Sequence, residues 1–149
     1  MTTPDTNRLT ELLQQKHQVL VQLQALAKRL LDATTGGDTA AMISLIAAKQ
    51  GLIDALMSVE KQLSPFREQS PEERVWDSPE HRANAAEISQ QCNLLLEDIM
   101  TLDRQGIEQA QSRQAKTKLQ IDSAHHAASA RNAYLSNDAA VAPRIDVAS

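Results

Sequence analysis

The feature that most constrains this chain is the return of leucine, isoleucine and valine at spacings of three and four along most of its length. Such spacing places apolar side chains on one side of an α-helix, and that side must be buried against something. Aromatic residues make up only 2% of the sequence, and this composition favours helices packed on helices over sheets. We therefore predict an all-α fold.

Two apolar stripes in the first part of the chain predict a helical hairpin. The stripe in residues 5–33 comprises Leu9, Leu12, Leu13, Val19, Leu20, Leu23, Leu26, Leu30 and Leu31. The stripe in residues 39–63 comprises Met42, Leu45, Ile46, Ile53, Leu56, Met57 and Leu63. Asp5 or Thr6 can cap the first helix, and Asp38 can cap the second after a glycine-containing turn. A connection this short makes the two helices antiparallel neighbours.

Residues 64–78 are predicted to be the main connector. Ser64-Pro65 and Ser70-Pro71 resist continuous helix, because proline lacks an N–H and restricts the residue before it. The connector also holds Phe66 and Trp76. Two interpretations of this aromatic pair stay open: the rings cap the open end of the bundle, or they form a docking spot for a partner.

A third helix is predicted from residue 79, where a proline follows Ser78. Its heptad seam consists of Ile88, Cys92, Leu95, Ile99, Leu102 and Gly106. Beyond Gly106 the same register brings polar residues inward, so the helix either extends past the hairpin or bends there. We predict an antiparallel bundle of three long helices in one domain, residues 1–135, comprising the hairpin 5–63, the connector and the long helix 79–135. A flexible tail is predicted at 136–149.

The net charge and the composition limit the kinds of partner that this protein is expected to bind. The formal net charge is −4 and basic residues are scattered, which argues against nucleic acid as a partner. Polar residues interrupt the apolar stretches within a few positions, so no membrane insertion is expected. The N-terminal residues have neither a basic opening nor an apolar run and do not read as a secretory signal. We predict a cytoplasmic protein.

No catalytic centre, metal site or cofactor is predicted. The histidines lack the spacing of a zinc site; they are His17, His81, His125 and His126. Glu97, Asp98 and Asp103 lie beside the seam, but nothing near them in the sequence supplies a partner for acid–base chemistry, so we expect a solvated face. An enzymatic or metal-binding bundle would need inward polar ligands, whereas the seam offers carbon and one sulfur.

Three residues on the apolar stripes have plain structural interpretations. Cys92 lies on the seam and is predicted to be a small buried hydrophobe rather than a reactive thiol. Lys16 and Lys49 interrupt the hairpin stripes. We expect their aliphatic stems to line the edge of the core while the ammonium groups reach water.

The order of these features resembles the FlgN/FliT group of flagellar export chaperones. A leucine-rich first helix is followed by Gly37-Asp38, which opens a helix reading Leu45-Ile46, Lys49, Leu52-Ile53 and Leu56. A proline-containing connector then leads to a long helix with Asn93, Leu95, Ile99 and Asp103, ending near Ala133-Tyr134. The resemblance covers residues 9–135, whereas the aromatic connector and the final residues have no match in the family pattern.

The resemblance implies a function without catalysis. Proteins of this group bind hook-associated or filament-tip subunits of the flagellum in the cytosol, prevent their premature assembly and deliver them to the export apparatus. The alternative is a structural or signalling coiled-coil protein that acts through self-association, in which case the partner is a second copy of the chain.

The weak apolar edge of the long helix is the predicted partner-binding segment, within residues 107–135. Its candidate residues are Ile107, Ala110, Leu119, Ile121, Ala124, Ala128, Tyr134 and Leu135. Small alanines allow a second helix to approach closely, and the tyrosine is an amphipathic anchor of the kind enriched at binding hot spots.

Overall fold

The computed structural model describes the backbone of residues 5–148 and the side chains of residues 5–136. Within this range the chain is helical and contains no strand. The elements are α1 (Thr6–Gly36), α2 (Thr39–Glu68), the short 3-10 helix η1 (Pro71–Glu73) and α3 (Pro79–Ala148). The predicted all-α class with three long helices is confirmed.

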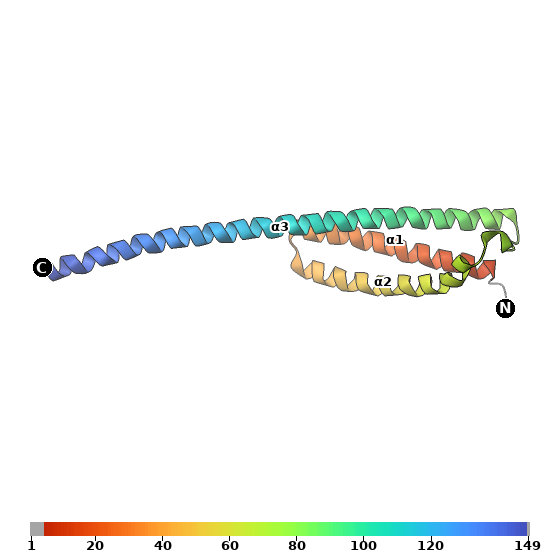
Figure 1. Cartoon of the computed structure of the whole chain (residues 1–149), viewed down its shortest axis with the longest axis horizontal. Helices are drawn as coiled ribbons and strands as arrows, with labels where there is room; N and C mark the ends of the chain where they lie inside the picture. Colours follow the sequence, from red (N-terminus) through yellow and green to blue (C-terminus); the bar gives the residue numbers. More distant parts are fainter. Residues whose placement is uncertain (1–4, 149) are drawn as a thin grey trace. The chain divides into compact units, whose positions relative to one another are not determined.

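The chain divides into two compact units, Met1–Gln109 and Ala110–Ser149. The boundary falls inside the single domain, residues 1–135, that the sequence predicted. In the first unit, α1, α2 and the first part of α3 lie side by side (Figure 1). The start of α1, the connector and the start of α3 lie at one end of this bundle, and the turn between α1 and α2 lies at the other.

Residues at the helix ends account for where the helices begin and stop. The carboxylate of Asp5 accepts a hydrogen bond from the backbone N–H of Asn7 at 2.9 Å and caps α1. Gly37 ends that helix with a φ of 72°, a left-handed backbone conformation that residues other than glycine rarely adopt. Asp38 then caps α2 by accepting from the N–H of Ala41 at 3.0 Å. The predicted cap of α2 at Asp38 is confirmed, and of the two residues that could cap α1 the structure uses Asp5.

The core of the first unit has two clusters of buried side chains. The cluster nearer the connector consists of Leu9, Leu12, Val59, Leu63 and Phe66. The second cluster consists of Leu20, Leu23, Cys92 and Ile99, with partly buried residues of α2 packed against it. The α1 stripe thus lies between α2 and α3, and the predicted seam of α3 faces the hairpin.

Pro65 is the clearest departure from the predicted element boundaries. We expected α2 to end at residue 63, but it runs through Pro65 to Glu68. Leu63 and Phe66 lie on the same side of the helix as Val59, and these three side chains are buried. Ending the helix before Phe66 would remove its ring from the core, and burial of this aromatic ring offsets the hydrogen bond that proline cannot donate. The connector is therefore shorter than predicted.

The third helix continues through Gly106 without interruption, whereas the sequence left open whether it extends past the hairpin or bends there. The backbone is also helical from residue 136 to Ala148, where we expected no regular structure. Alanine has the highest helix propensity of all residues, and this segment is rich in it. The flexibility of residues 136–149 stays a prediction. The side chains of residues 137–149 lie outside the described part of the structure.

By length and composition α2 is apolar enough to cross a membrane, a property that the sequence analysis did not assign to it. Much of its apolar surface is exposed in the first unit, including Ile43, Ile46 and Met57. Among the described residues this is one such helix, and a single helix that meets the criterion by length and composition is weak evidence for a membrane span. The absence of membrane insertion stays a prediction.

Candidate functional site

The predicted partner-binding residues are all exposed. Ile107 belongs to the first unit and the others belong to the second. In the second unit, one side of the helix carries Ala110, Ile121, Ala124, Ala128 and Leu135, whose spacings of three, four, seven and eleven are helical repeats. Leu119 lies about 200° around the helix from Ile121 and does not share this side. Tyr134 also lies off it. The eight predicted residues therefore do not form a single stripe.

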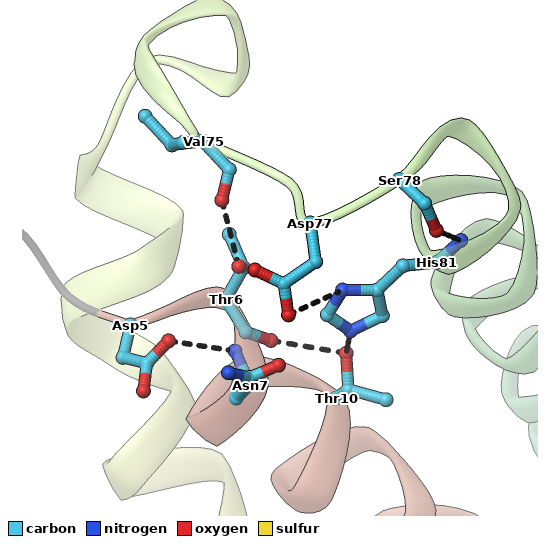
Figure 2. A network of polar contacts seen from close by, with 8 residues as sticks. All are labelled: Asp5, Thr6, Asn7, Thr10, Val75, Asp77, Ser78 and His81. Carbon is cyan, nitrogen blue, oxygen red and sulfur yellow. Dashed lines mark hydrogen bonds and ion pairs between the residues drawn. The ribbon is translucent and has the colours of Figure 1, made fainter.

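A polar network joins the start of α1 to the connector and to α3 (Figure 2). The hydroxyl of Thr6 donates to the carbonyl of Val75 at 2.8 Å. One turn later, the Thr10 hydroxyl lies 2.8 Å from Nε2 of His81 on α3. The Ser78 hydroxyl accepts from the backbone N–H of His81 at 3.1 Å and caps α3, which confirms the predicted start of that helix.

The order Thr10, His81 and Asp77 superficially matches a nucleophile, a base and an orienting carboxylate. The Thr10 hydroxyl, however, donates its only hydrogen to the carbonyl of Thr6 at 3.0 Å. Its oxygen must then accept from Nε2–H of His81, which is the reverse of a base that deprotonates a hydroxyl. Nδ1 of His81 lies 3.9 Å from Asp77, beyond hydrogen-bond length. This network holds the connector in place.

A cavity of about 400 Å³ opens beside this network, between the three helices of the first unit. Its apolar lining includes Leu9, Leu63, Phe66 and Trp76. The Trp76 ring meets the His81 ring edge-on, with centroids 5.1 Å apart. Phe66 thus belongs to the core, as one interpretation of the aromatic pair expected, while both rings also line a cavity.

Every charged residue that lines the cavity is basic: Lys16, Arg67, Arg74 and Arg82. Lys16 is buried and its Nζ lies 2.8 Å from a Glu60 oxygen, so this ammonium group ends in an ion pair instead of reaching water as predicted. Arg67 pairs with the other Glu60 oxygen. Burial alone would raise the pKa of Glu60, but hydrogen bonds from Lys16 and Arg67 outweigh it and leave that pKa below its ordinary value.

Two acidic residues expected on a solvated face instead join helices. Asp103 accepts from Nζ of Lys49 on α2 at 2.7 Å, so the second stripe-interrupting lysine is also paired. Asp98 accepts from the side-chain amide of Gln24 on α1 at 2.5 Å. Glu97 is exposed, as expected. The sequence did not indicate these pairs because the partners are far apart along the chain.

Cys92 is 1% exposed and packs in the second core cluster, which confirms its prediction as a small buried hydrophobe. Its Sγ lies 3.9 Å from the carbonyl of Leu13. Burial raises the pKa of the thiol, with smaller and opposing effects from Lys16 and Glu60. Among the described residues, no group of three or more His, Cys, Asp or Glu side chains is placed to hold a metal ion.

Sequence reasoning missed the arginines of the cavity. Arg67, Arg74 and Arg82 flank the aromatic connector residues, and this interleaving of cations with Phe66 and Trp76 was the available signal. Comparison of the chain with protein-family models, with curated proteins and with solved structures found no significant match.

Proposed function

We propose that this protein is a cytosolic flagellar export chaperone of the FlgN/FliT type. It binds hook-associated or filament-tip subunits, prevents their premature assembly and delivers them to the export apparatus. The proposal rests on the resemblance carried by Gly37-Asp38, Lys49 and the long third helix, and on the character of residues 110–136. Such a chaperone acts by binding alone, without a cofactor or a chemical step.

The observation that carries the proposal is the exposure of every described side chain in residues 110–136. A helix with no buried side chain gains little from tertiary packing and is stabilised when a partner covers its apolar side. The alanine-rich side with Ile121 and Leu135 suits a helix of the client, because small residues let two helices approach closely. We assign client binding to this side.

Self-association through the same helix is the alternative, and it predicts a different stoichiometry. The heptad seam that would favour a coiled coil is already used inside the first unit, where Cys92 and Ile99 are buried. That observation favours a separate client over a second copy. Light scattering of the purified chain, with and without a flagellar subunit, distinguishes a one-to-one complex from a homodimer.

Calorimetric titration of the full-length chain with hook-associated and filament-tip subunits tests the assignment. The variant Ile121→Asp places a charge on the apolar side and is expected to weaken binding at least tenfold, since a buried unpaired charge is strongly unfavourable. Leu135→Asp should act in the same direction. Both residues are exposed, at 51% and 53%, so neither change disturbs a packed core.

Val75→Asp is the matched control. Val75 lies in the connector and is 80% exposed, so it receives the same chemical change outside the proposed surface. The affinity of the Val75→Asp variant for the flagellar subunits should equal that of the unsubstituted chain. Undiminished binding by Ile121→Asp and Leu135→Asp would place the client elsewhere, and absence of binding to any flagellar subunit would reject the chaperone function.

A further inference from the structure

The cavity at the connector end of the first unit has an electrostatic character opposite to that of the chain. The sequence carries a formal net charge of −4. The charged residues of the cavity lining are nevertheless all basic, and they come from α1, α2, the connector and α3. A concave surface lined by one sign of charge attracts ligands of the opposite sign.

The basic side chains differ in how far their charges are already neutralised. Lys16 and Arg67 share the single carboxylate of Glu60. Arg74 donates from one terminal nitrogen to the carbonyl of Phe66 at 2.7 Å and from Nε to Gln69, neither of which carries a charge. Arg82 is exposed, and its guanidinium makes no ion pair with any side chain in residues 5–136. Arg74 and Arg82 can therefore receive a carboxylate.

Apolar side chains complete the lining beside these cations. Leu9, Leu63 and Phe66 are at most 5% exposed and belong to the first core cluster. Trp76 is half-buried and is held edge-on by His81. A site of this kind favours a ligand that presents large apolar groups next to negative charges.

We propose that this cavity binds an acidic, amphipathic segment of a partner protein, in which two or more carboxylates flank leucine-like side chains. A volume of about 400 Å³ is at the small end of ligand sites and accommodates a few side chains. A fatty acid offers one carboxylate, which can engage only part of a cationic lining spread over four elements. A peptide with several acidic residues engages more of it, and arginine pairs carboxylates in a bidentate manner.

This site is separate from the segment assigned to the flagellar client and does not rest on that assignment. Its lining lies wholly within Met1–Gln109. Loss of flagellar subunit binding would leave the cavity proposal intact, and the reverse also holds.

Fluorescence of Trp76 in the full-length chain provides a local test, because it is the only tryptophan in the sequence and lines the cavity. The probe is a short acetylated and amidated peptide of alternating Glu-Glu and Leu-Leu pairs. Its addition should change the Trp76 emission saturably, and high salt should weaken the binding. Peptides with lysine in place of glutamate, or serine in place of leucine, should bind at least tenfold more weakly.

Arg82→Glu reverses the unpaired charge at an exposed position and should weaken binding of the Glu/Leu peptide roughly tenfold. Arg104→Glu is the matched control, since Arg104 is also exposed on α3 and does not line the cavity. Circular dichroism verifies that both variants fold. An unchanged Trp76 emission, equal binding of the Lys/Leu peptide, or an unaffected Arg82→Glu variant would overturn the proposal. So would an emission change that follows protein concentration without peptide, which would identify a second copy as the occupant.

Discussion

Glu60 illustrates how a single side chain connects helix packing with the basic lining of the cavity. Its carboxylate receives Lys16 from α1 and Arg67 from its own helix. The Lys16 side chain is only 11% exposed, so its charge depends on this partner. A partly buried ammonium group without a counter-charge is costly, whereas the complete pair is tolerated. Glu60 therefore fixes Lys16 at the edge of the core.

The lowered pKa of Glu60 makes stability depend on pH in one direction. Because the folded pKa lies below the ordinary value of 4.5, the pair contributes its full stabilisation above 4.5 and loses it as pH falls through the folded pKa. The variant Glu60→Gln should lower the free energy of unfolding at neutral pH by about 1–3 kcal/mol. Urea denaturation of both proteins between neutral pH and about pH 3 should show this difference shrinking as the solution becomes acidic. A difference that grows on acidification would contradict the assignment.

The environment of a side chain could be predicted where the local sequence pattern decides it. It could not be predicted where the environment depends on a partner far away along the chain. Cys92 was predicted as buried because its position on the seam decides its environment. Lys49 and Asp103 are separated by 54 positions, and their pairing emerges only when α2 packs on α3. The arginines of the cavity follow the same rule, since they come from α2, the connector and α3 and converge only when these elements pack together.

The three long helices differ in how well their boundaries follow from sequence. Caps at Asp5, Asp38 and Ser78 depend on contacts within a few residues, and the sequence predicted the start of each helix to within one residue. Pro65 signalled an end to α2 that does not occur, because local propensity was overridden by burial of Phe66. Element boundaries are thus predictable where a local hydrogen bond sets them and less so where the core does.

The register of α3 can be tested by comparing two apolar residues on different sides of the helix. Ile99 is 6% exposed in the second core cluster, and truncation to alanine should cost about 2–5 kcal/mol. Leu94 is 58% exposed, so Leu94→Ala should change the free energy of unfolding by no more than about 0.5 kcal/mol. Leu95 is half-buried, and its truncation should fall between these values. Chemical denaturation of the variants measures all three, and equal costs for Ile99→Ala and Leu94→Ala would mean that the register is wrong.

At the scale of the whole molecule, the two units differ in what stabilises them. The first unit, Met1–Gln109, contains both core clusters and the polar contacts that join its helices. The described side chains of the second unit, residues 110–136, are all exposed. In the sequence this contrast appears as a seam that fails beyond Gly106. A unit boundary could not be predicted there, because helix propensity stays high where core-forming residues become scarce.

Limited proteolysis should reveal the difference in stability between the units. A helix without buried side chains opens locally at little free-energy cost, and proteases cleave such openings. Trypsin should therefore cut the full chain first after exposed basic residues of the second unit, at Lys116, Lys118 or Arg131. Mass spectrometry of early time points should show an N-terminal fragment that retains both core clusters and resists further digestion, with a cooperative thermal transition of its own.

First cleavage at Arg29 of α1 or Lys61 of α2 would show instead that the helical hairpin is the weaker part, because both are exposed trypsin sites within the first unit. Saturating the chain with a bound flagellar client should slow the cuts after residue 110 selectively, because only a covered helix loses its local openings.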